Sequence, residues 1–263
     1  MEPSEASFRF YAELLDFFPP LKRREAERRG PAREATEMPF RFHVPPTVKD
    51  AIESLGVPHV EVDLILVNGV SVDFAHRLAD GDRVSVYPVF ESLDIAPLVR
   101  LRPAPLRRTA FVADVHLRRL ARLLRLLGFD VRHANDLDDR DLVDISVEER
   151  RILLTRDRQL LKHGRLTHAT WIRSTDPIEQ ACEVVRRFDL AGSAKPFSRC
   201  PACNGLLEAV DKAAVADEIP PKTARWLDEY VRCDGCGKLY WRGTHFARLE
   251  GLVGRILGEA AQA

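Results

Sequence analysis

The chain has 263 residues, of which 45% are hydrophobic, and this composition supports folded cores and excludes a wholly disordered protein. Its 40 basic and 40 acidic residues cancel, so the overall charge does not indicate a polyanion as partner. No apolar run approaches the roughly 18 residues of a membrane helix, and the N-terminus lacks the pattern of a signal peptide, so we expect no membrane association.

Residues 1–92 are expected to form a mixed sheet with one helix. Strands are predicted over residues 8–11, 41–44, 62–67 and 83–88. Thr47 can cap a helix over residues 48–55, which Gly56 ends. Residues 19–38 are flanked by proline and densely charged, which predicts a mobile loop.

Two stretches of this region resemble the small sulfur-carrier proteins of the ubiquitin-like, β-grasp fold. They are residues 66–72 (LVNGVSV) and residues 78–88 (LADGDRVSVYP). Sulfur carriers need a C-terminal Gly-Gly, whereas here the strand continues into Phe90 and Glu91. The resemblance therefore implies the fold and not the chemistry. What remains is a domain that binds a protein partner or positions a substrate.

Residues 93–109 read as a linker, because they contain three prolines and four arginines. A parallel α/β sheet is predicted for residues 110–191, with strands at 110–113, 129–131, 152–155 and 169–173. Apolar residues at helical spacing predict a helix between the first two strands, which Gly128 ends. Asp176, Pro177 and Glu179 have the pattern of a helix N-terminus, so we leave Asp176 out of any site.

Acidic residues follow the predicted strands of this sheet. Asp114 and Asp157 lie just past two strands, and Asp139 begins the helix between them, with Asp141 close by. The carboxyl edge of a parallel sheet is where ligands bind. Clustered carboxylates attract a hard cation, and Mg²⁺ or Mn²⁺ held there can hydrolyse a phosphodiester. Because each acid also precedes a predicted helix, capping is the alternative for any one of them.

Basic residues accompany these acids. Residues 93–191 carry 19 Lys and Arg against 15 Asp and Glu, whereas residues 1–92 carry 11 against 16. Arginine suits phosphate contacts, although a solvated face is the alternative for each one. The predicted RNA contacts in this domain are Arg118, Arg122, Arg125 and Arg156.

Residues 192–263 are expected to form a zinc ribbon. Two C-x₂-C pairs, with 29 residues between them, supply the ligands Cys200, Cys203, Cys233 and Cys236. Four thiolates bind Zn²⁺ tetrahedrally, and a site with all ligands from protein is structural. Metal-binding cysteines indicate a reducing compartment, so we expect the cytoplasm. Lys238, Trp241 and Arg242 suit RNA binding, with packing of Trp241 in the ribbon core as an equal alternative.

The chain from residue 111 to its end resembles the Mut-seven C-terminal RNase domain. The matching motifs are residues 111–117 (FVADVHL), 120–130 (LARLLRLLGFD), 138–142 (DDRDL), 152–160 (ILLTRDRQL), and the ribbon motifs at 199–205, 233–241 and 243–245. The resemblance implies a PIN-like nuclease fold followed by a zinc ribbon. It also implies a metal-dependent ribonuclease with Asp114, Asp139 and Asp157 as its acids. Asp141 stands where this family is expected to have Glu.

We therefore predict metal-dependent hydrolysis of RNA, with Zn²⁺ as a structural ion and Mg²⁺ or Mn²⁺ as the catalytic one. The alternative is a non-catalytic RNA-binding or ribosome-associated adaptor, in which the acids only cap helices. A receiver-like phosphorylation domain is a weaker alternative, because no suitably placed Lys follows a late strand.

Overall fold

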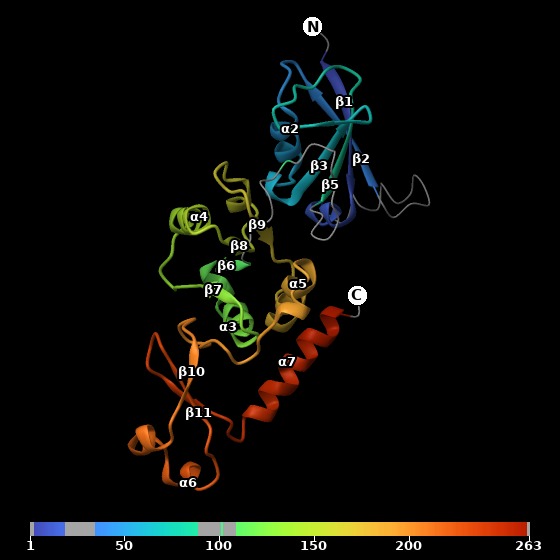
Figure 1. Cartoon of the computed structure of the whole chain (residues 1–263). Coiled ribbons are helices and arrows are strands. Elements are labelled where there is room, and N and C mark those ends of the chain that lie inside the picture. Colours follow the sequence, from blue (N-terminus) through green and yellow to red (C-terminus); the bar gives the residue numbers. More distant parts are fainter. Residues whose placement is uncertain (1–2, 19–34, 89–100, 102–108, 262–263) are drawn as a thin grey trace. The chain divides into compact units, whose positions relative to one another are not determined.

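The structure is a computed structural model that describes residues 3–18, 35–88, 101 and 109–261 (Figure 1). The described residues separate into two compact units. The first combines residues 1–106 with Asp157–Thr170, and the second combines Arg107–Arg156 with Trp171–Ala263. Among the described helices, none has both the length and the apolar character needed to span a bilayer.

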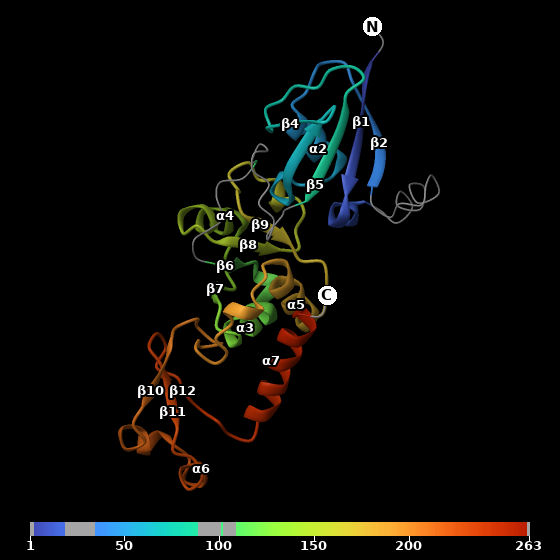
Figure 2. The same cartoon turned by 45° about the vertical axis from the view of Figure 1, so that its right-hand side comes forward.

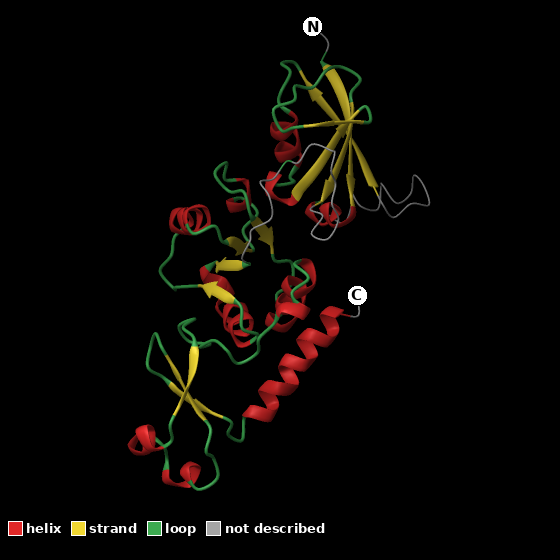
Figure 3. Cartoon of the chain, viewed as in Figure 1, coloured by secondary structure: helices red, strands yellow, loops and turns green. Residues whose placement is uncertain are grey.

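A five-stranded mixed sheet forms the body of the first unit. The strand order is β2-β1-β5-β3-β4. The bounds are β1 Ser4–Tyr11, β2 Ala35–Phe42, β3 Val62–Val67, β4 Val70–Val72 and β5 Arg83–Pro88. β1 pairs in parallel with β5, and the other pairs are antiparallel. Helix α2, Val48–Leu55, lies against one face of this sheet (Figure 3). This is the ubiquitin-like arrangement predicted from the sequence.

Alternation along the strands builds the core of this sheet. Phe8 and Phe10 of β1 are buried, whereas Arg9 between them is exposed. Helix α2 begins where expected, because the Thr47 hydroxyl accepts a hydrogen bond from the Asp50 amide at 3.1 Å. The predicted bounds of α2, β3 and β5 are confirmed at both ends.

β2 differs from the sequence prediction. It pairs with β1 over eight residues, from Ser4↔Phe42 to Tyr11↔Ala35. Residues 35–38 therefore lie in a strand and not in the predicted loop, and Val44 is exposed beyond the strand. The rest of the predicted loop, residues 19–34, lies outside the described residues. So does the predicted linker, apart from Leu101 and Thr109.

The second sheet has the order β7-β6-β8-β9. Its strands are β6 Ala110–Ala113, β7 Asp130–Arg132, β8 Ile152–Thr155 and β9 Ala169–Trp171. β6 runs parallel to both β7 and β8, and every residue of β6 and β8 is buried, as expected for central strands. The helices are α3 Arg118–Leu126, α4 Asp139–Glu148 and α5 Pro177–Arg187. α4 lies on one side of the sheet and α3 and α5 on the other (Figures 1 and 2).

The C-terminal part begins with a three-stranded antiparallel sheet around a small core. Its strands are β10 Leu207–Val210, β11 Tyr230–Cys233 and β12 Leu239–Trp241. Val215, Ile219 and Tyr230 form the core, and the short helix α6, Pro221–Ala224, lies in the connection before β11. A sixteen-residue helix, α7 Phe246–Ala261, follows and packs along α5.

Helix α7 was not predicted, although its sequence carried the signal. Leu249, Leu252, Val253 and Ile256 recur at helical spacing, and Val253 and Ile256 are buried. The predicted third domain, residues 192–263, thus ends on a helix that belongs by packing to the α/β sheet. The predicted domain boundaries remain predictions. The two compact units follow a different division of the chain, based on packing.

Gly128 ends α3 at a point where the backbone of Lys195 lies very close to it. Its φ of +93° lies in the left-handed region, and the Gly128 amide donates to the Arg125 carbonyl at 2.9 Å. A Cβ at this position would lie 2.2 Å from the Lys195 carbonyl oxygen. Lys195 is fixed there, since its amide donates to the Leu127 carbonyl at 3.0 Å. The end of α3 therefore needs glycine for two reasons.

We expect Gly128→Ala to destabilise the second unit by about 2 kcal/mol, because the new Cβ combines a strained φ with overpacking. The thermal midpoint should fall by roughly 4–8 °C, measured by circular dichroism. Gly192→Ala is the control, because Gly192 has no positive φ and no atom within 4 Å of its Cβ position. Equal midpoints for the two variants would contradict this account.

Candidate metal centre and candidate active site

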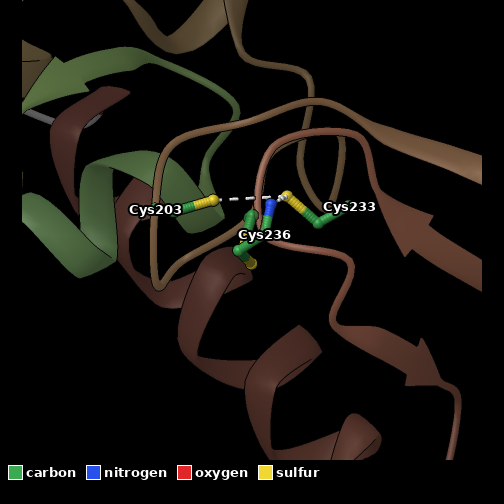
Figure 4. A group of neighbouring side chains, drawn as sticks. Cys203, Cys233 and Cys236 are labelled. Carbon is green, nitrogen blue, oxygen red and sulfur yellow. Dashed lines mark hydrogen bonds between the residues drawn. The ribbon is translucent and has the colours of Figure 1, made fainter.

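Four cysteines form the group of potential metal ligands found among the described residues. Their sulfur atoms all lie within 4.8 Å of one another. The Cys203 and Cys233 sulfurs are 3.3 Å apart, and those of Cys200 and Cys236 are 3.8 Å apart. A tetrahedral zinc with Zn–S bonds near 2.3 Å separates its sulfurs by about 3.8 Å. Figure 4 shows Cys203 on one loop facing Cys233 and Cys236 on another. The cluster can therefore hold a structural zinc ion.

The surroundings of the sulfurs are tightly packed. A Cβ at Gly205 would lie 2.7 Å from the Cys233 sulfur and 2.4 Å from the Asp234 carboxylate, so a larger residue would displace a side chain of the cluster. The Tyr240 hydroxyl is 3.0 Å from the Cys200 sulfur. Burial and then this hydrogen bond raise the pKa of Tyr240, so the hydroxyl stays protonated and donates a hydrogen bond to the sulfur.

The thiols do not ionise alike. Burial raises the pKa of Cys200, but hydrogen bonds from Tyr240 and from the Cys203 and Ala202 amides outweigh it and bring this pKa to about 6. Burial, together with the neighbouring sulfurs, raises the pKa of Cys203 to about 12. Four thiolates at this separation would repel one another strongly. A divalent cation replaces the thiol protons, which is the chemistry that zinc supplies to such a cluster.

Arg125 fastens the first cysteine loop to the α/β sheet. Its side chain is only 4% exposed. Its Nε donates to the Val131 carbonyl in β7 at 2.9 Å, and its Nη1 donates to the carbonyls of Pro201 and Ala202 at 3.3 and 3.0 Å. Burial lowers the pKa of Arg125, while the nearby Cys203 and Cys200 favour its charged form. The predicted role of Arg125 in RNA binding is thus replaced here by a structural one.

A second polar contact lies beside Arg125. The Asn204 amide group donates to Asp130 Oδ1 at 2.8 Å and accepts from the Val131 amide at 2.9 Å. Arg151 also donates to Asp130 Oδ1, at 2.8 Å. Burial opposes ionisation of Asp130, but the hydrogen bonds from Arg151 and Asn204 prevail and lower its pKa. The residue that follows Cys203 is therefore fixed to the first residue of β7.

Asp114 is a buried carboxylate at the carboxyl end of β6. It is 7% exposed, and its Oδ2 accepts a hydrogen bond of 2.6 Å from the Thr155 hydroxyl at the end of β8. It precedes the short 3-10 helix Val115–Leu117, but its side chain does not cap it. The capping alternative is therefore wrong for Asp114. A buried carboxylate that faces the end of the neighbouring strand fits a ligand-binding edge.

The acidic residues at the start of α4 have different roles. Asp138 is the N-cap, since its Oδ1 accepts from the Asp141 amide at 2.8 Å. Asp141 Oδ2 accepts in return from the Asp138 amide at 3.1 Å, which completes a capping box. Asp139 is exposed and takes no part in it. Capping thus occupies Asp141 and leaves the Asp139 carboxylate available.

An acidic hollow of about 290 Å³ lies next to this helix. Asp136, Asp141, Asp144, Glu148 and Glu149 line it together with Arg132. Neither Asp114 nor Asp139 is among its lining residues. Of the predicted acids on this sheet, the hollow therefore includes Asp141 alone.

Asp157 belongs to the first unit. It is exposed, and its Oδ1 accepts hydrogen bonds from the Gln159 and Leu160 amides at 2.7 and 3.4 Å. This carboxylate is therefore anchored to the turn that follows it.

The other residues predicted to bind RNA are mostly at the surface. Arg118, Arg122 and Arg156 are exposed, as are Lys238 and Arg242. Lys238 lies over the Tyr240 ring and Arg242 over the Phe246 ring, at 5.6 and 5.0 Å from the ring centres. Trp241 packs against the ribbon core, with its ring 6.3 Å from that of Tyr230. Trp226 is 84% exposed but was not among the residues predicted to bind RNA.

Comparison with protein families connects both units to known domains. Residues 109–253 match the Mut7-C RNAse domain. The chain belongs to this family. Residues 3–94 match a second family, the Mut7-C ubiquitin domain. No curated protein and no solved structure matches the chain.

The Mut7-C RNase assignment agrees with the fold. It covers the parallel α/β sheet, the four cysteines and the beginning of α7, and it implies RNA as the class of substrate. The supporting residues of the Mut7-C RNase domain escaped sequence analysis, because Arg125, Asn204 and Thr155 act through contacts that no local pattern encodes.

We expect the purified Mut7-C RNase protein to carry one zinc ion per chain and Cys233→Ser to lose it, because the three remaining thiolates leave the tetrahedron open. Atomic emission on protein purified without chelator measures the content. Cys182→Ser is the matched control, since Cys182 is buried against α7, with its sulfur 3.4 Å from Glu259 Oε2 and outside the cluster. Zinc retained by the Cys233 variant would refute the assignment.

Arg125→Met should weaken zinc retention by roughly 10–100-fold, the range typical of outer-shell partners. It removes a cation beside the thiolates and leaves the Pro201 and Ala202 carbonyls without their donor. Competition with a chromogenic chelator measures the loss. Arg122→Met, at an exposed position of the same helix, should release zinc like the wild type.

Proposed function

We propose that this Mut7-C RNase protein is a metal-dependent ribonuclease that hydrolyses RNA phosphodiester bonds at the carboxyl edge of its parallel sheet. The observation that carries the proposal is Asp114. It is buried, it follows the central strand β6, it does not cap the helix after it, and Thr155 of β8 orients one of its oxygens. A buried carboxylate without a capping role needs another explanation, and an RNase domain supplies one.

Asp139 and Asp157 are the proposed partners of Asp114. Asp157 lies two residues past β8, the strand that neighbours β6, and the Asp139 carboxylate is exposed outside the capping box. The donor set consists of carboxylate oxygens, which fits Mg²⁺ or Mn²⁺. Such an ion polarises the phosphodiester and lowers the pKa of a bound water. Asp141 is the weakest member, since its carboxylate is engaged with the Asp138 amide.

The proposed RNA-binding surface uses exposed cations. Arg118 and Arg122 are four residues apart on α3 and so share one side of the helix. With Arg156, Lys238 and Arg242 they supply charge for the phosphate backbone. Trp241 contributes only the part of its ring that the ribbon core leaves exposed. We leave Arg125 out of this surface because of its burial.

The second proposed metal is structural. Zn²⁺ on Cys200, Cys203, Cys233 and Cys236 has all its ligands from protein, so no position remains for a substrate. Thiolate ligation on this scale requires a reducing compartment, which supports a cytoplasmic location.

A non-catalytic RNA-binding adaptor is the second candidate function. The capping box favours it in one respect, because it gives Asp138 and Asp141 a purely structural task. Metal dependence separates the two. An adaptor binds labelled RNA equally well in EDTA and leaves its length unchanged, whereas a nuclease shortens it only with the divalent ion.

Asp114→Asn should reduce cleavage of total RNA in Mn²⁺ by more than about 100-fold, beyond the loss typical of an outer-shell partner. The amide keeps the shape of the side chain but removes its charge. Gel analysis of end-labelled RNA measures the rate.

Asp176→Asn is the matched control. Its carboxylate accepts hydrogen bonds from the Ile178 and Glu179 amides at the start of α5, and asparagine caps helices equally well. Its cleavage rate should equal that of the wild type. Full activity of a folded Asp114→Asn protein would overturn the proposed function.

A further inference from the structure

One segment of the RNase domain packs with the ubiquitin-like domain. Asp157–Thr170 lies between β8 and β9, inside the stretch that matches the RNase family. In the structure it nevertheless forms one compact unit with the N-terminal sheet. The family boundary in the sequence is therefore not a boundary in packing.

His59 makes a buried contact with the segment. It is 7% exposed, and both of its ring nitrogens have partners. Nδ1 lies 2.6 Å from Glu53 Oε1 of α2, and Nε2 lies 3.1 Å from the Leu166 carbonyl oxygen. A carbonyl oxygen only accepts, so Nε2 is the donor. The ring thus links the end of α2 to the segment.

Three further residues of the segment, Arg158, Lys162 and Thr170, also contact the N-terminal part of this unit. Arg158 donates to the Phe17 carbonyl and stacks over the Phe17 ring at 4.9 Å. Lys162 Nζ donates to the Glu53 carbonyl at 2.6 Å. The Thr170 hydroxyl donates to Glu61 Oε1 at 3.3 Å, in a buried contact.

Together with Leu166, these contacts recur at every fourth residue and so cover the whole segment. Between them, Leu160 and Leu161 of the 3-10 helix Leu160–Lys162 are buried, and this helix packs against the 3-10 helix His59–Glu61. A segment bound at four points and through a buried apolar surface is fixed relative to its partner.

Asp157 is the first residue of this segment. Its carboxylate accepts hydrogen bonds from the Gln159 and Leu160 amides, and Arg158 lies between Asp157 and these two residues. The position of the carboxylate therefore follows the position of the segment. We propose that the ubiquitin-like domain is an intramolecular positioning element for Asp157, acting through the segment 157–170.

The proposal rests on the proposed function, because it assigns Asp157 to the metal-holding acids. It also bears on the expected protein partner of the ubiquitin-like domain. Phe17, the end of α2 and His59 are already occupied by the chain's own RNase segment, so the surface they form is used within the molecule.

Two variants of the full chain test the proposal. His59→Ala removes the bond to the Leu166 carbonyl, and Lys162→Met removes the bond to the Glu53 carbonyl. His43→Ala is the control, since His43 is exposed just past β2. Hydrogen–deuterium exchange with peptide readout should show faster exchange in residues 157–170 for both variants and none of this for the control.

The second measurement is RNA cleavage as a function of Mn²⁺ concentration. If the variants loosen a metal ligand, cleavage at limiting Mn²⁺ should fall at least about 10-fold, as for the loss of an outer-shell partner, and should recover at saturating Mn²⁺. A role confined to stability would lower the rate without changing its Mn²⁺ dependence. The Lys162 variant keeps the test decisive if His59→Ala fails to fold.

The outcomes separate the two proposals. Unchanged exchange in residues 157–170 in both variants would overturn the docking, and faster exchange with an unchanged Mn²⁺ dependence would overturn the positioning role. A wild-type protein that cleaves no RNA in Mn²⁺ would overturn the proposed function and the catalytic consequence with it, while the exchange result would still decide the docking.

Discussion

The buried guanidinium of Arg125 is the interaction on which the second unit depends. A cation removed from water is costly unless its hydrogen bonds are made, and this one finds acceptors in β7 and in the first cysteine loop. The planar fork of arginine sets the separation of these two backbones. Four thiolates around one divalent ion carry net negative charge, so a fixed cation beside them also balances the cluster. The cysteine cluster and the sheet are thus parts of one structure, which a separately folding ribbon would not be.

Sequence analysis predicted the elements whose signals are local. Apolar runs gave β6 and β8 with their observed bounds, and Thr47 and Gly56 marked both ends of α2. The cysteine cluster was equally accessible, because C-x₂-C spacing is itself a local pattern that reflects the size of the metal. β2 was placed less well, because its extent depends on pairing with β1, some thirty residues away in the chain.

The site residues were harder to assign, because one residue type serves several purposes. Asp138, Asp139 and Asp141 look equivalent in sequence, but a capping box engages the first and third and leaves the second out. Asp114 holds the N-cap position of a 3-10 helix, but its side chain makes no capping hydrogen bond and instead accepts one from Thr155, forty-one residues later. Arg125 lies on the same helix as Arg118 and Arg122 but points into the molecule. Only the tertiary contacts distinguish these roles.

Tertiary contacts also determine how the ubiquitin-like domain can act on the RNase segment 157–170. Leu160 and Leu161 are buried in a helix that packs against the ubiquitin-like part, and burial of one leucine contributes about 1.5–3 kcal/mol. These side chains, with the hydrogen bonds of His59 and Lys162 across the contact, hold the segment to the N-terminal sheet. A ubiquitin-like domain joined only by a linker would be free to recruit partners. One held this firmly has a surface that is already committed, and a substitution at His59 is therefore felt first in the RNase segment that begins with Asp157.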